Sequence, residues 1–239
     1  MDVLGDLMAR DRRSGRDALR VEATDRTDTY HDFITTSYKA GNVLRYLGVR
    51  KAGHVALEPV ALPETLLTFF GAAQLGAVTS FDADSEARVT LVDVAREDEF
   101  DLPPGQKLAT YGGPPKRAST THWEKEVWSE NPAVHPEIVS PDDVVLLADG
   151  TEYTHRDLMT TAHELVADYS LGPDDAVALC APITHPGAVV AGIVAPLLAG
   201  GTVVVPDGDP DDSENVVLVV GEGDFEAETV APDDVLSLD

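Results

Sequence analysis

The chain has 239 residues, of which 43 are acidic and 17 basic, so its formal net charge at pH 7 is −26. With 43% hydrophobic residues it can still bury a sizeable core, and the charge must therefore lie on the surface of one or two domains. Because such a surface repels phosphate backbones and anionic lipid, we expect neither nucleic acid nor a membrane as a partner.

The usage of charged residues and of cysteine indicates a compartment. Asp outnumbers Glu and Arg outnumbers Lys, a usage typical of halophilic proteins, and at molar salt a Debye length of about 3 Å screens the self-repulsion. The single cysteine, Cys180, excludes a disulfide within the chain, and acids stand where a signal peptide needs positive charge. We therefore expect an acidic, halophilic, cytoplasmic protein, and we interpret the uncharged stretch 188–205 as a buried helix and strand.

The first part of the chain predicts alternating helices and strands. Apolar residues at helical spacing predict a helix over about 31–46, and a short buried strand is expected at 55–57. Pro63 opens a second helix that ends near Gly76. Further strands are expected at 77–81 and 89–93.

A self-comparison at an offset of about 125 residues predicts an internal repeat. Thr-Tyr-His-Asp at 29–32 faces Thr-His-Arg-Asp at 154–157, and Val-Ala-Leu occurs at both 55–57 and 177–179. Strands that are apolar on both faces and separated by helices favour a mostly parallel sheet. We therefore predict an α/β fold of two similar subdomains, with mostly parallel sheets flanked by helices.

The predicted domain boundaries follow from composition. The first subdomain covers 1–100 and the second, its repeat, covers 144–239. Residues 101–143 are rich in Pro and Gly and are expected to form an irregular linker. Within this linker, Trp123 and Trp128 are expected to bury against the flank of a domain.

Most motifs of catalysis and metal binding are missing from the sequence. The seven histidines lack zinc spacing, and no nucleophile elbow, dinucleotide-binding glycine motif or phosphate loop is present. The Gly-rich run 112–116 ends in Lys116, but its two prolines remove N–H donors, so we interpret it as a turn. His31 and His155 are interpreted as exposed first-turn residues. We expect no catalytic residue, no cofactor and no metal.

His185 is the remaining candidate, because it lies between a buried strand and the start of an apolar helix. Open α/β sheets bind their ligands at the carboxyl ends of strands, which is where this residue stands. The alternative from spacing alone is a histidine that only caps the helix.

Seven segments of the chain follow one known family pattern in order and spacing: 29–33, 47–57, 71–82, 154–158, 171–177, 182–187 and 196–206. They resemble the superfamily of AMP-forming acyl-CoA synthetases, adenylation domains and luciferases. This resemblance implies that His185 lines an acyl pocket, with Thr184 and Gly187 in the same turn, and that the fold is that of the large N-terminal domain of these ligases.

One departure from the family pattern concerns ATP. In the family, the strand matching 142–147 leads into a Ser/Thr/Gly-rich loop that holds the triphosphate. Here only Ala-Asp-Gly-Thr-Glu-Tyr at 148–153 precedes Thr154, and Asp149 and Glu152 would repel phosphate. The sequence also stops before the motifs that bind adenine and ribose and before the catalytic lysine of the family.

Three hypotheses about function remain, and they leave the enzyme status open. The first is a shortened, non-catalytic relative of AMP-dependent acyl-CoA synthetases that binds an acyl or CoA-like small molecule or a partner protein. The second is an active ligase completed by another chain. The third is an unrelated α/β binding module. Apolar edges that a missing half would cover also suggest a homodimer.

The net charge of −26 predicts that stability depends on salt. Lowering NaCl from molar to about 0.1 M lengthens the Debye length to about 10 Å and exposes the self-repulsion of the surface. We expect the melting temperature to fall steadily over this range. A melting temperature that does not change with salt would contradict this expectation.

Overall fold

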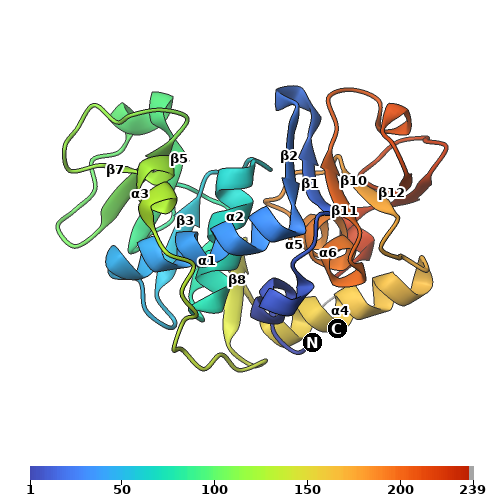
Figure 1. The fold of residues 1–239 in the computed structure, drawn as a ribbon, viewed down its shortest axis with the longest axis horizontal. Helices are drawn as coiled ribbons and strands as arrows, with labels where there is room; N and C mark the ends of the chain where they lie inside the picture. Colours follow the sequence, from blue (N-terminus) through green and yellow to red (C-terminus); the bar gives the residue numbers. More distant parts are fainter. Residues whose placement is uncertain (237–239) are drawn as a thin grey trace. The chain divides into compact units, whose positions relative to one another are not determined.

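The computed structural model describes residues 1–236, and it divides the chain into two compact units (Figure 1). Unit 1 comprises Met1–Ile34 and His155–Asp239, and unit 2 comprises Thr35–Thr154. Each unit is built on one mostly parallel sheet with flanking helices. The predicted α/β fold class is therefore confirmed.

Unit 2 carries a seven-stranded sheet in which all neighbours are parallel except the last pair. The helices that belong wholly to it are α2 (Pro63–Gln74) and α3 (Trp123–Ser129), and α1 (Tyr30–Tyr46) enters it at residue 35. In sheet order the strands are β7 (Thr121–His122), β6 (Lys107–Tyr111), β5 (Val89–Asp93), β3 (His54–Leu57), β4 (Val78–Ser80), β8 (Val144–Ala148) and β9 (Thr151–Thr154).

Unit 1 carries a six-stranded sheet, flanked by α4 (His155–Asp168) and by a helical run over 186–199. That run consists of α5 (Pro186–Val189), a π-helical turn (Val190–Val194) and α6 (Ala195–Ala199). In sheet order the strands are β13 (Glu228–Val230), β12 (Val216–Val220), β10 (Ala176–Leu179), β11 (Thr202–Val205), β1 (Asp17–Val21) and β2 (Arg26–Thr29).

The two sheets have corresponding strand orders. The order β6-β5-β3-β4-β8-β9 in unit 2 matches β13-β12-β10-β11-β1-β2 in unit 1, with the same parallel and antiparallel neighbours. The antiparallel hairpin β1–β2 precedes α1 but joins the sheet of unit 1, and the hairpin β8–β9 precedes α4 but joins the sheet of unit 2. Each hairpin thus completes a sheet whose other strands come from the other half of the chain.

These hairpins explain why the compact units differ from the expected boundaries at 1–100, 101–143 and 144–239. Residues 1–34 associate with the second half of the chain, and 144–154 with the first half. Residues 101–143 are not an irregular linker, because they contribute β6, β7 and α3 to unit 2. Composition did not predict these strands, because the elements are short and many prolines lie around them.

The helices of unit 2 begin and end as their sequences indicate. Pro63 stands at the first position of α2, where its fixed φ suits a helix start. The helix ends before Gly76, whose φ of +64° is a left-handed conformation that favours glycine. Inside the unit, the ring of Phe69 packs 5.2 Å from that of Phe70 and 5.4 Å from that of Phe81.

The two tryptophans of α3 have different environments. Trp123 is 5% exposed, and its indole N–H donates to the Thr68 hydroxyl at 2.9 Å. Trp128 is 86% exposed, so the expectation that it would bury is wrong. The reason is helical geometry, because a residue five positions after Trp123 points to the opposite side of a single short helix.

The apolar stretch 188–205 folds as parts of α5 and α6, the π turn between them and β11. Within residues 1–236, no helix combines the length and the apolar composition needed to cross a bilayer.

Helices α1 and α2 approach each other closely at two glycines. A Cβ atom on Gly71 would lie 2.6 Å from the Gly41 backbone nitrogen and 2.9 Å from the Ser37 carbonyl oxygen. These are backbone atoms that cannot move independently, so only glycine allows this contact between the helices.

Gly71→Ala should therefore destabilise the protein by about 1–3 kcal/mol, the usual cost of overpacking. The expected sign opposes helix propensity, which by itself favours Ala over Gly by about 1 kcal/mol. Denaturant unfolding in molar salt measures the change, with Gly15→Ala as the control, because a Cβ on Gly15 has no neighbour within 4 Å. Equal or increased stability of Gly71→Ala would show that the helices are not in this contact.

Candidate functional site

The connection between β8 and β9 consists of two residues. Ala148 pairs directly with Thr151, so that only Asp149 and Gly150 form the turn. Both have positive φ angles, 49° and 77°, as a tight two-residue hairpin of type I′ requires. This is the position where the resemblance places the triphosphate loop. Two residues offer at most two backbone N–H groups, too few to surround a triphosphate.

His185 caps the helical run that begins at Pro186. Its Nδ1 accepts a hydrogen bond from the Gly187 N–H at 3.1 Å, and its Nε2 lies 3.0 Å from an Asp233 carboxylate oxygen. Thr184 is exposed, whereas Gly187 is buried. A Cβ on Gly187 would clash with the Pro232 carbonyl oxygen, so this backbone packs directly against Gly187.

The two other histidines at helix starts differ from each other. His31 is exposed, as expected, but His155 is 0% exposed, so the expectation of an exposed His155 is wrong. Its Nδ1 accepts a hydrogen bond from the Leu4 N–H at 3.1 Å. The N-terminal segment, 151 residues earlier in the chain, thus covers this histidine, which explains why local sequence gave no sign of its burial.

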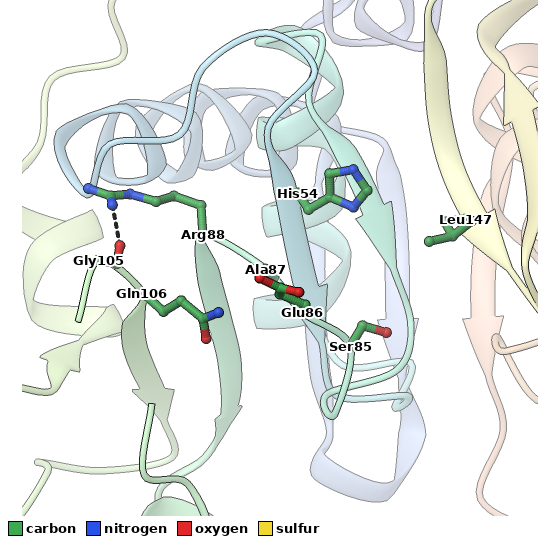
Figure 2. A pocket seen from close by; sticks show the side chains of 8 residues that line it. All are labelled: His54, Ser85, Glu86, Ala87, Arg88, Gly105, Gln106 and Leu147. Carbon is green, nitrogen blue, oxygen red and sulfur yellow. Dashed lines mark hydrogen bonds between the residues drawn. The ribbon is translucent and has the colours of Figure 1, made fainter. Parts of the chain in front are cut away.

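Unit 2 has a hollow of about 610 Å³ at the amino ends of its strands. Figure 2 shows His54, Glu86 and Gln106 among the side chains around it. The Arg88 guanidinium is already used, because it donates to the carbonyl oxygens of Leu47 and Gly105. Parallel sheets bind ligands at the opposite, carboxyl edge, so we do not assign a site to this hollow.

The carboxyl edge of the same sheet is organised by a buried carboxylate, Glu58, directly after β3. It accepts hydrogen bonds from the Tyr111 hydroxyl at 2.6 Å, from the Asp93 N–H at 2.7 Å and from Arg96 at 3.1 Å. Burial would raise the pKa of Glu58, but these hydrogen bonds lower it below its usual range. The network therefore fixes the ends of β3, β5 and β6 relative to one another.

A second cavity, of about 600 Å³, lies beside the loop that follows β6. This volume is typical of sites for small molecules. The cavity is lined by the loop 114–120, by β7, by the first turn of α3 and by Tyr46 at the end of α1. Lys116, Arg117, His122 and Lys125 are among its lining residues.

Three of the lining side chains, Lys116, Arg117 and Lys125, are cationic and one, Glu126, is anionic, so the lining has more positive than negative groups. Lys116 pairs with Asp98 at 2.5 Å, which raises the pKa of Lys116, and His122 lies 3.3 Å from a Glu124 oxygen. Lys125 is exposed and has no ion-pair partner in the described part of the chain. The cavity is therefore a candidate site for an anionic ligand, in a protein whose net charge is −26.

The sequence predicts only a turn around Lys116. The structure confirms that these residues form a turn, but it also shows that they line a cavity together with Tyr46. Because Tyr46 lies about 70 positions earlier in the chain, local sequence does not reveal this contact. One signal was available in the sequence, because two of only five lysines, Lys116 and Lys125, lie within ten residues of each other. Among residues 1–236, no group of three His, Cys, Asp or Glu side chains could hold a metal ion.

Comparison with known families gives the class of the protein. The family model for AMP-binding enzymes matches residues 82–223, more than half of the chain, and the chain therefore belongs to this family. The match rules out the hypothesis of an unrelated α/β module. A search of curated proteins found no match.

Solved structures of AMP-forming ligases share the fold. They include the anthranilate CoA ligase AuaEII in complex with anthranoyl-AMP (19% identity, TM-score 0.77, 92% of this chain and 49% of that chain). MatB from Rhodopseudomonas palustris is similar at 17% identity and a TM-score of 0.73, over 92% of this chain and 48% of that chain. The N-terminal domain of FACL13 from Mycobacterium tuberculosis is similar at 20% identity and a TM-score of 0.75, over 92% and 63%. The chain thus spans about half the length of the first two.

Proposed function

We propose that this member of the AMP-binding enzyme family does not form acyl adenylates and instead binds a CoA-like molecule. The observation that carries the proposal is the two-residue turn at Asp149 and Gly150. Adenylation needs donors that surround a triphosphate, and this turn supplies neither a glycine-rich backbone cradle nor hydroxyl groups. The exposed carboxylates of Asp149 and Glu152 add repulsion at the same position.

The cavity beside α3 supports a CoA-like ligand. CoA carries a diphosphate and a separate 3′-phosphate, so its charge is spread over two positions that Lys116 and Lys125 can meet individually. Tyr46, which is 83% exposed at the cavity, offers a ring on which a base can stack. ATP concentrates its charge in one triphosphate, and the nearby carboxylates of Asp98, Glu124 and Glu126 oppose it.

The alternative is an active ligase in which another chain completes the ATP site. That chain would have to provide every donor that the turn between β8 and β9 lacks. Tight ATP binding that appears only with a partner chain would favour this alternative.

Calorimetric titration with CoA, ATP and pantetheine tests the proposal, at the lowest salt concentration that keeps the fold intact. We expect CoA to bind at least about tenfold more tightly than ATP, and pantetheine, which has no phosphate, not to bind. The double variant Lys116→Gln/Lys125→Gln should weaken CoA binding by about tenfold, corresponding to about 1.4 kcal/mol for two charge-assisted contacts.

Lys107→Gln is the matched control, because Lys107 is an exposed lysine at the other end of β6 and should leave CoA binding unchanged. Micromolar ATP affinity in the isolated chain would overturn the proposal. CoA binding that is absent, or that does not respond to the double variant, would remove the cavity from it.

A further inference from the structure

The loop that lines the cavity is built around a side chain that does not reach the cavity. Glu97 belongs to the short 3₁₀ helix Val94–Glu99, which directly follows β5, and it is 0% exposed. One carboxylate oxygen accepts the Lys116 N–H at 2.7 Å, and the other accepts the Arg117 N–H at 3.0 Å. The Arg117 side chain and the Thr120 hydroxyl also donate to this carboxylate.

We propose that Glu97 is a positioning residue of the cavity. Its buried carboxylate accepts hydrogen bonds from residues 115–120 and so holds them in the conformation that lines the cavity. Two successive backbone N–H groups, a hydroxyl and a guanidinium around one carboxylate form the kind of donor set that usually receives a bound anion. Here the chain provides the anion itself. The effect of Glu97 on ligand binding rests on the proposed CoA-like ligand. Its effect on the conformation of residues 115–120 does not depend on that proposal.

Glu97 can act in this way because its own backbone is fixed. The 3₁₀ helix is capped by Asp93, whose carboxylate accepts the Ala95 N–H at 2.7 Å. Arg96 ties the same helix to Glu58 at 3.1 Å, and so to the buried network at the carboxyl edge of the sheet. The sheet therefore fixes the position of the Glu97 carboxylate, and this carboxylate in turn fixes the loop by its hydrogen bonds to Lys116 and Arg117.

The same contacts decide which cation remains for a ligand. The Arg117 guanidinium is used up, because it donates to the Glu97 carboxylate and to the main-chain oxygens of Glu97 and Phe100. Lys116 is oriented outward, since its backbone N–H is bound by Glu97 while its ammonium group pairs with the exposed Asp98. Because Glu97 engages Arg117, the lining cations that remain for an anionic ligand are Lys116 and Lys125.

The bonds to Glu97 also predict a pH profile. Burial alone would raise the pKa of Glu97, but the donors of Lys116, Thr120 and Arg117 lower it to about 2. The stabilisation that this lowered pKa represents is fully present above the ordinary pKa of Glu, about 4.3, and is lost as the pH falls towards 2. Order in the loop should therefore persist well below pH 4.

Hydrogen exchange at the Lys116 and Arg117 amides tests the inference in Glu97→Ala and Glu97→Gln, in molar salt. We expect exchange in Glu97→Ala to be at least about tenfold faster than in the wild type, because two charge-assisted hydrogen bonds are lost. Acetate at about 0.1 M should occupy the vacated position and slow exchange again, by mass action. Glu97→Gln keeps one acceptor and should be intermediate, so it carries the test if Glu97→Ala does not fold.

Glu99→Ala is the control, because Glu99 lies on the same 3₁₀ helix but its side chain is 58% exposed and, among residues 1–236, pairs only with Arg96. Unchanged exchange in both Glu97 variants, equal effects in Glu99→Ala, or no response to acetate would overturn the inference. CoA affinity is measured separately, and we expect it to fall together with loop order. If CoA does not bind the wild type while the exchange results hold, the proposed ligand fails and the positioning role of Glu97 stands.

Discussion

The register of the β8–β9 pair is the constraint on which this account depends. Once Ala148 is paired with Thr151, two residues remain for the turn, and any longer loop would have to break the ladder that completes the sheet of unit 2. The equivalent hairpin in unit 1, β1–β2, leaves four residues between its strands. The segment where the resemblance places the triphosphate loop is thus a structural hairpin in this chain, and the proposal that the chain does not form adenylates rests on it.

In this acidic chain, two buried carboxylates connect segments that lie far apart in the sequence. Glu58 joins the carboxyl ends of three strands, and Glu97 organises the loop that lines the cavity, each by accepting several hydrogen bonds. Charge is also divided unevenly, since unit 1 has 25 acidic against 7 basic residues and unit 2 has 18 against 10. All five lysines belong to unit 2, which is where a cavity suited to an anionic ligand is found.

The sequence predicted those features that depend on local pattern. Helical spacing and Pro63 placed α1 and α2 within a few residues of their observed bounds, and apolar runs located β3 and β10. It could not predict features made by distant segments, such as the exchange of hairpins between the sheets, the burial of His155 by the N-terminal segment, or a cavity whose wall includes Tyr46. Trp128 was misplaced because hydrophobicity alone does not give the direction of a side chain on a short helix.

The most direct test of the central claim is ATP–pyrophosphate exchange by the whole chain in molar salt, with short, aromatic and long-chain carboxylic acids. The reaction reports adenylate formation whatever step follows it. A tight turn between β8 and β9 predicts that no acid raises the incorporation of label above the background without acid. Carboxylate-dependent exchange by the purified chain would contradict the account, because the triphosphate would then have to be held by groups other than those at this turn.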